Sequence, residues 1–213
     1  DKKVIVGVTC GDINGIGLEI LIKTFLDKTF LNKCVFIVYV PVKIIKDYNK
    51  KIKNKNFNYN IVDDPQKALL DSINIVDFQS NDVKLNLGRS KSLAAQVAID
   101  SLDLAVKDLK EKSIDVLVTL PVNKKNISSV RKDFIGHTEY FSSQFNNQEN
   151  LMLLCSEKLK IATATNHIPV SKISKEITKS LIKRKINILI QTLKQDFLIS
   201  NPNIAVLSLN PHA

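Results

Sequence analysis

The chain has 213 residues, of which 44% are hydrophobic and 24% charged, and it contains only six glycines and six prolines. This composition excludes a disordered or fibrous protein and suits one large domain or two smaller lobes. The formal net charge is +10, but only Arg89, Arg131 and Arg184 are arginines, and the lysines are spread among asparagine and isoleucine. Nucleic-acid surfaces usually concentrate both cations beside exposed aromatics, so the charge favours a solvated surface.

The cysteines and the lack of long apolar runs predict a cytoplasmic protein. Cys10, Cys34 and Cys155 are odd in number and form no close pair, which favours a reducing compartment over a disulfide framework. No apolar run approaches the roughly 20 residues that span a bilayer. The apolar run after Lys3 is too short for a signal peptide. We therefore expect no membrane and no nucleic acid among the partners.

Short β-branched runs alternate with longer amphipathic stretches, which is typical of a mostly parallel α/β sheet. The runs predicted as strands are Val4–Thr9, Val35–Val40, Tyr59–Val62, Ile114–Leu120, Leu151–Cys155, Ile161–Thr165 and Ile204–Leu209. Helical spacing predicts helices over about Ser90–Lys112 and Ser174–Asp196. A polar, lysine-rich stretch follows Pro121, so we expect a first lobe over 1–125 and a second over 126–213.

The segment Gly11-Asp12-Ile13-Asn14-Gly15-Ile16-Gly17-Leu18-Glu19 follows the first strand and opens a helix. Its glycine amides and helix start suit an anion. The spacing is neither G-x-G-x-x-G nor a P-loop. A tight turn and a ligand-binding loop are equally compatible with it.

The segment Gly136-His137-Thr138-Glu139 precedes an amphipathic stretch. One interpretation is a helix start, capped by Thr138 and with Glu139 near the positive end of the helix dipole. In a second interpretation, an imidazole, a hydroxyl and free helix amides converge there on a phosphate or carboxylate. Both interpretations can hold together.

His167 and His212 each follow a predicted strand, 45 residues apart (212 − 167). Loops at the carboxyl ends of parallel strands are where α/β folds bind ligands, so the two side chains could meet in one metal site. Catalytic metals commonly take three protein ligands, and His137 is the simplest third candidate. Ordinary surface histidines are the alternative. The chain stops just after the last predicted strand, so we expect it to be a fragment.

Five of these phrases together resemble the family of 4-hydroxythreonine-4-phosphate dehydrogenases, enzymes of vitamin B6 biosynthesis. The phrases are Gly11-Asp12-x-x-Gly15-Ile16-Gly17-x-Glu19, Thr119-x-Pro121-Val122-Asn123-Lys124, Gly136-His137-Thr138-Glu139, His167-x-Pro169 and Leu209-Asn210-Pro211-His212-Ala213. They keep the family's order and approximate spacing. The chain departs from the family at Ile13 and Leu18, where prolines are usual, at Asn14, where a small residue is common, and at Asn166, where threonine is frequent.

The resemblance implies a three-layer α/β/α fold with two lobes and a cleft, like that of isocitrate and isopropylmalate dehydrogenases. It also implies NAD and a divalent metal (Zn²⁺, Mg²⁺ or Co²⁺), the metal being held by three histidines drawn from both subunits of a homodimer. His167 and His212 match two of those ligands, and the third is expected after Ala213. His137 and Thr138 match residues that bind the phosphorylated amino-acid substrate, so they are not expected to bind the metal.

The implied reaction is oxidation of 4-phosphooxy-L-threonine to a β-keto acid, which loses CO₂ to give 3-amino-2-oxopropyl phosphate. In such a reaction the metal lowers the pKa of the substrate hydroxyl, a base takes the proton, and hydride passes to NAD. Asp12 is the carboxylate to test first as that base. The rivals are a sister dehydrogenase for an erythronate- or threonate-type phosphate and, from another class, a non-catalytic nucleic-acid-binding module.

Overall fold

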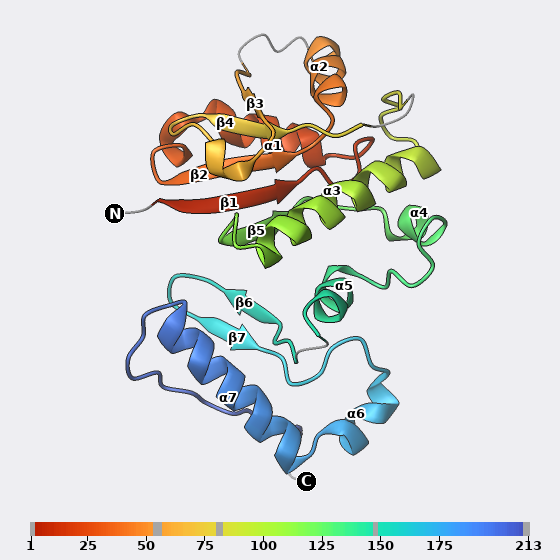
Figure 1. The fold of residues 1–213 in the computed structure, drawn as a ribbon. Coiled ribbons are helices and arrows are strands. Elements are labelled where there is room, and N and C mark those ends of the chain that lie inside the picture. Colours follow the sequence, from red (N-terminus) through yellow and green to blue (C-terminus); the bar gives the residue numbers. More distant parts are fainter. Residues whose placement is uncertain (1–2, 53–56, 80–82, 147–148, 211–213) are drawn as a thin grey trace. The chain divides into compact units, whose positions relative to one another are not determined.

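A computed structural model describes residues 3–52, 57–79, 83–146 and 149–210 of the chain. The chain divides into two compact units, unit 1 (residues 1–144) and unit 2 (residues 145–213), and each is described by itself. Unit 1 is built on a five-stranded sheet of order β3-β4-β2-β1-β5, in which every described pairing is parallel (Figure 1). Its strands are β1 (Val4–Thr9), β2 (Cys34–Tyr39), β3 (Asn60–Val62), β4 (Ile73–Val76) and β5 (Val116–Thr119).

Helices and strands of unit 1 mostly alternate, as the hydrophobic pattern predicts, but only a 3₁₀ turn separates β3 from β4, and α5 follows α4 directly. They are α1 (Gly17–Leu26), α2 (Val42–Lys51), α3 (Ser92–Lys110), α4 (Lys124–Ser128) and α5 (His137–Gln144), with short 3₁₀ turns at Lys28–Phe30 and Pro65–Lys67. The lysine-rich run 43–55 forms most of α2. The lysines of α2 are exposed while Ile44 and Ile45 are fully buried, and residues 53–56 lie outside the described part.

The central strand β2 explains why helices cover both faces of this sheet. Successive side chains of a strand point to opposite faces. Ile37 and Tyr39 are buried in a cluster that contains Ala105 of α3. Val38, which points the other way, belongs to a cluster that contains Ile22 of α1. Unit 1 therefore has helix, sheet and helix layers, and each fully buried aliphatic side chain of the strand contributes roughly 2 kcal/mol.

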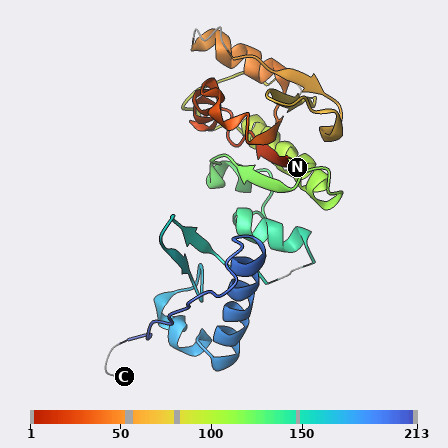
Figure 2. The same cartoon turned by 90° about the vertical axis from the view of Figure 1, so that its left-hand side faces the viewer.

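The described residues of unit 2 form a β-hairpin and two helices. The strands β6 (Leu153–Cys155) and β7 (Lys160–Ala162) pair antiparallel, and α6 (Val170–Glu176) and α7 (Lys179–Gln195) follow. Lys185 of α7 donates to the carbonyl oxygen of Asn150 at 2.6 Å, and the hairpin and α7 lie side by side in both views (Figure 2). Leu193 is the only buried hydrophobic side chain among the described residues of unit 2.

The predicted α/β class with a mostly parallel sheet is confirmed, and most predicted elements differ from the observed ones by a few residues. The strand predicted over Ile204–Leu209 is wrong. No strand is assigned there, and Val206 and Leu207 are 60% and 89% exposed, because no described strand lies beside this segment. The helix predicted over Ser174–Asp196 is two helices, because Thr178 is extended and caps the second by accepting from the Leu181 amide at 3.2 Å.

Strand β4 was not predicted, and Asn74 is the reason. This polar residue interrupts the apolar run Ile73–Val76, yet its side chain is fully buried. The Asn74 side chain donates to the carbonyls of Phe36 and Leu69 and accepts from the Leu69 amide at 2.9 Å. A buried amide with these partners does not disfavour a strand, although the sequence pattern alone suggests that it should.

The boundary between the two compact units lies at 144–145, further along the chain than the lobe boundary expected at 125–126. Helices α4 and α5 are counted with unit 1, and α4 makes several contacts with α3. The assignment of 1–125 and 126–213 to two lobes of the enzyme stays a prediction. No helix in the described ranges is both long and apolar enough to cross a membrane.

Candidate active site

The first glycine-containing loop lies against the end of β5. Gly11 has φ +60, and a Cβ at this position would lie 2.4 Å from the carbonyl oxygen of Pro121. The amide of Asp12 donates to the same oxygen at 2.9 Å. Two of the phrases noted in the sequence therefore meet at the carboxyl edge of the sheet, where parallel α/β folds place their ligands. Glycine is required at position 11 both by its φ and by this close approach.

Asn14 joins this loop to the segment that precedes α3. Its side chain is only 4% exposed. The amide nitrogen donates to the carbonyl of Arg89 at 3.1 Å, and the side-chain oxygen accepts from the amide of Asn86 at 2.7 Å. Its backbone carbonyl accepts from the Gly88 amide at 2.8 Å. The departure from a small residue at this position thus has a structural reason, because Asn14 holds two loops together.

Asp12, the predicted base, is half-buried at the same edge. Its carboxylate accepts from the amide of Asn14 at 2.9 Å, which closes a local turn. This contact gives Asp12 a structural task in the loop. Its role as a base stays a prediction.

Lys124 reaches the start of α5 from the start of α4. A Cβ built on Gly136 would lie 3.7 Å from Lys124 Nζ and 2.9 Å from a carboxylate oxygen of Glu139. Both charged groups therefore lie directly over Gly136, where a larger residue would displace them. The side chain of Asn123 caps α4 by accepting from the Asn126 amide at 3.0 Å, and this fixes where the helix carrying Lys124 begins.

His137 is the first residue of α5 and lies among aromatic rings. Its ring is 5.8 Å from that of Phe134, edge to face, and 6.2 Å from that of Phe141, nearly stacked. Burial lowers the pKa of His137, and the ammonium of Lys124 lowers it further. Both effects penalise the imidazolium, so this imidazole is neutral at neutral pH.

The helix start predicted at this phrase is confirmed, but Thr138 is not its cap. Helix α5 begins at His137, so Thr138 lies within the first turn, where Glu139 also lies. The amide of Tyr140 bonds the carbonyl of Gly136 at 3.0 Å, so the chain already turns helically at Gly136. The positive end of the α5 dipole, the Lys124 ammonium and the Thr138 hydroxyl together suit an anion, and the Glu139 carboxylate beside them offsets part of that positive charge.

His167 lies on an exposed turn after β7, in unit 2. Its φ is +43, a conformation that few residues other than glycine adopt. Strained backbone of this kind often marks a functional position. His212, the second predicted metal ligand, lies outside the described residues. Within the described ranges, no three histidine, cysteine, aspartate or glutamate side chains gather as a metal site would require.

Sequence reasoning missed two features of unit 1. Lys124 belongs to the motif Thr119-x-Pro121-Val122-Asn123-Lys124, but the motif does not show that Lys124 lies beside the start of α5. Asp103 lies on the polar stripe of α3 and gave no signal, yet it binds Arg131 and Tyr140. In the sequence, a carboxylate that bonds a distant arginine looks like one that faces solvent. The spacing of apolar residues along a helix does not reveal which distant residue it will contact.

These observations first define a class of protein. Unit 1 is a parallel α/β structure whose glycine loop and Lys124 follow the carboxyl ends of β1 and β5, where such folds bind ligands, and Lys124 reaches the helix start that carries His137. The model of one family, the pyridoxal phosphate biosynthetic protein PdxA, matches residues 32–213. The chain belongs to this family.

Two relatives agree with this membership, and a solved structure agrees with the fold. A 4-hydroxythreonine-4-phosphate dehydrogenase of Bacteroides thetaiotaomicron is 40% identical over all of this chain, which covers 58% of that protein. A protein of the same name from Sulfurihydrogenibium is 33% identical over 97% of this chain and is covered to 63%. The crystal structure of a protein of that name from Burkholderia phymatum superposes with a TM-score of 0.84 at 24% identity, over all of this chain and 64% of that one. The chain thus spans about three fifths of the length of these relatives.

Proposed function

We propose that the complete protein oxidises 4-phosphooxy-L-threonine with NAD, in a divalent-metal-dependent reaction of pyridoxal phosphate biosynthesis. The β-keto acid formed loses CO₂ to give 3-amino-2-oxopropyl phosphate. The observation that carries the proposal is the group of Lys124, His137 and Thr138 at the start of α5, in a chain of the PdxA family. A phosphorylated substrate needs such a site, and the relatives are named for this substrate.

The phosphate is held by charge and by directed hydrogen bonds. The Lys124 ammonium supplies a full positive charge and the start of α5 a partial one, while the Glu139 carboxylate beside Lys124 offsets part of this attraction. The Thr138 hydroxyl can donate a further bond to a phosphate oxygen. Because phosphate is the part of the substrate farthest from the reacting carbon, these contacts orient the molecule without taking part in bond breaking.

His137 adds a bond whose strength depends on the ligand. Its low pKa leaves it neutral in the empty site. A phosphate dianion nearby favours the charged form of an imidazole, so binding can draw a proton onto His137. The bond then becomes charge-assisted, which is roughly twice as strong as a neutral one.

Asp12 is proposed as the base that takes the proton of the substrate hydroxyl, because it is half-buried at the carboxyl edge of the sheet. His167 would hold the metal together with His212 and a further ligand, and an exposed imidazole suits Zn²⁺ or Co²⁺. When bound, the metal supplies Lewis-acid chemistry that lowers the pKa of that hydroxyl. NAD is proposed as the hydride acceptor.

We also propose a homodimer that works in the cytoplasm and shares its active sites between subunits. The exposed apolar residues of unit 2 support this; examples are Leu154, Leu159, Ile161 and Val170, each more than half exposed. Light scattering on the purified complete protein tests the state of association. A monomer at micromolar concentration would contradict the dimer.

The decisive experiment measures NADH formation by the complete protein with Zn²⁺, Mg²⁺ or Co²⁺ added in turn. A second candidate substrate is D-threonate 4-phosphate, because a Clostridium botulinum protein named for that dehydrogenase activity is 26% identical over all of this chain. The higher identity to the hydroxythreonine phosphate enzymes favours 4-phosphooxy-L-threonine. Turnover of the threonate alone would overturn the preferred substrate.

A further inference from the structure

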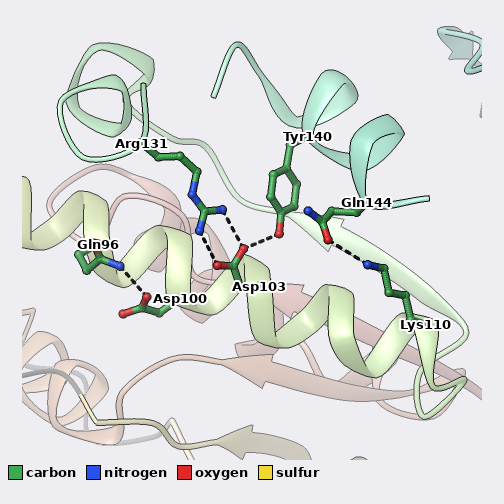
Figure 3. Close-up of polar contacts among 7 residues, drawn as sticks. All are labelled: Gln96, Asp100, Asp103, Lys110, Arg131, Tyr140 and Gln144. Atoms are coloured by element: carbon green, nitrogen blue, oxygen red, sulfur yellow. Dashed lines mark hydrogen bonds and ion pairs between the residues drawn. The ribbon is translucent and has the colours of Figure 1, made fainter. Parts of the chain in front are cut away.

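A carboxylate on α3 binds both ends of the segment that carries His137. Asp103 accepts two parallel hydrogen bonds from Arg131, at 2.9 and 2.7 Å, and a third from the hydroxyl of Tyr140 (Figure 3). Arg131 lies just after α4, and Tyr140 is the fourth residue of α5. We call these three residues the Asp103 cluster.

The cluster is held together by more than one kind of interaction. The Arg131 guanidinium also lies over the Tyr140 ring, 5.8 Å from its centre. Although partial burial opposes ionisation, the hydrogen bonds from Arg131 and Tyr140 lower the pKa of Asp103 below its usual range. The pKa values of Tyr140 and Arg131 are raised. At neutral pH, Asp103 is therefore ionised, the Tyr140 hydroxyl keeps its proton, and Arg131 is positively charged.

The cluster is connected directly to His137 by packing. Tyr140 follows His137 by three positions, so the two lie on the same face of α5, about one turn apart. The rings of Tyr140 and Phe134 are 5.9 Å apart, and Phe134 in turn contacts His137 at 5.8 Å. A shift of Tyr140 would therefore move both the helix start and the ring that His137 packs on.

We infer that Asp103 is a positioning residue, whose carboxylate fixes the segment 131–140 and thereby orients His137 and Thr138 toward the phosphate of the substrate. The inference rests on the proposed function for the identity of the ligand, but not for the contacts. A bidentate arginine bond defines the angle as well as the distance between its partners. A single carboxylate that binds both ends of a ten-residue segment restricts the path of the chain between them.

The structure supplies a matched control on the same helix. Asp100 lies one turn before Asp103 and accepts a bond from Gln96, at 2.7 Å, within α3 itself (Figure 3). Asp100→Asn and Asp103→Asn make the same chemical change at neighbouring positions. Only the second removes a contact to the segment that carries His137.

The first test needs no turnover. In the complete protein without substrate, inorganic phosphate is titrated while the imidazole signals of His137 are followed by NMR. Asp103→Asn should weaken phosphate binding roughly tenfold and shift the pH titration of His137 toward that of a free imidazole, whereas Asp100→Asn should leave both as in the wild type. Equal behaviour of the two variants would overturn the inference.

The second test separates orientation from folding. Asp103→Asn should raise KM for 4-phosphooxy-L-threonine roughly tenfold and change kcat less than about threefold. Tyr140→Phe keeps the ring and removes one hydrogen bond, so it should show a smaller rise in KM even if Asp103→Asn folds poorly.

Adding Arg131→Gln to Asp103→Asn should raise KM little further, because both changes break the same contact. A fall in kcat at unchanged KM would contradict a role in phosphate orientation. If no candidate substrate is turned over but the phosphate result holds, the proposed function fails and the positioning role stands.

Discussion

The two units of the chain bury their side chains very differently. In unit 1, aliphatic side chains on both faces of the sheet are buried against α1 and α3. In unit 2, Leu193 is the only buried hydrophobic residue among those described, and Leu198 and Leu207 are 83% and 89% exposed. The residues packed around the phosphate site proposed in unit 1, Phe134 and Tyr140, are themselves buried. His167 in unit 2 lies on an exposed turn.

The largest effect is expected at the exposed turn of unit 2. His167→Asn should reduce metal-dependent turnover of the complete protein by roughly a thousandfold, about 4 kcal/mol, since it removes a proposed ligand. Stability should change by less than about 0.5 kcal/mol, because the side chain is exposed and asparagine tolerates positive φ. NADH assays, metal analysis and urea unfolding measure the three quantities.

The matched variant in unit 1 tests whether the two histidines differ in role. His137→Ala should raise KM roughly tenfold while the metal content stays near that of the wild type. If the metal is lost from the His137 variant as well, the division between a phosphate-binding unit and a metal-binding unit is wrong.

Gly11→Ala should destabilise unit 1 by about 3 kcal/mol. An alanine here must adopt a left-handed φ of +60, and its Cβ would meet the Pro121 carbonyl oxygen at 2.4 Å. Gly88→Ala is the control, since its φ is +73 but nothing lies within 4 Å of the added carbon, and it should cost only about 1 kcal/mol. Urea unfolding of both variants checks the difference. Equal losses would show that backbone strain alone determines the glycine at position 11.

Leu193→Ala should destabilise unit 2 by about 2 kcal/mol, at the lower end for a buried leucine because its partly exposed surroundings can collapse into the space. Helix α7 should then exchange its amide hydrogens faster, while the strands of unit 1 keep their protection. Exchange measured by mass spectrometry resolves the two units. Loss of protection in β1 and β2 as well would show that the units unfold together.

The same contrast explains what could be predicted from the sequence. The strand Val4–Thr9 was predicted with its observed bounds, because most of its residues are buried and give an almost continuous apolar run. Ile204–Leu209 is also largely apolar but has no neighbouring described strand, and an apolar composition does not specify a partner strand. A buried polar residue has the opposite effect, because it hides a real strand: Asn74 interrupts the apolar run of β4, which was not predicted.

The candidate site was predictable in the same uneven way. His137 and Thr138 were identified from a short phrase, and the structure places both at the start of α5. Their surroundings depend on Lys124, which lies over Gly136, and on Asp103, which bonds Arg131 and Tyr140 far along the chain. Such contacts follow from the fold and leave no local pattern.

The smallest expected effect is a pH dependence that belongs to unit 1. Burial and Lys124 lower the pKa of His137 in the folded chain, and unfolding returns it to about 6.5. The unfolded chain therefore binds more protons than the folded chain between these two pKa values. The contribution of His137 to the free energy of unfolding is fully present above about pH 7.5 and is lost as the pH falls through 6.5. We expect a loss of less than about 1 kcal/mol between pH 7.5 and 5.5. Asp103, whose pKa is lowered below a usual value near 4, loses its contribution only in more acidic solution. Urea unfolding at the two pH values should show this loss in the wild type but not in His137→Gln. An equal loss in the variant would show that His137 does not carry the pH dependence of unit 1.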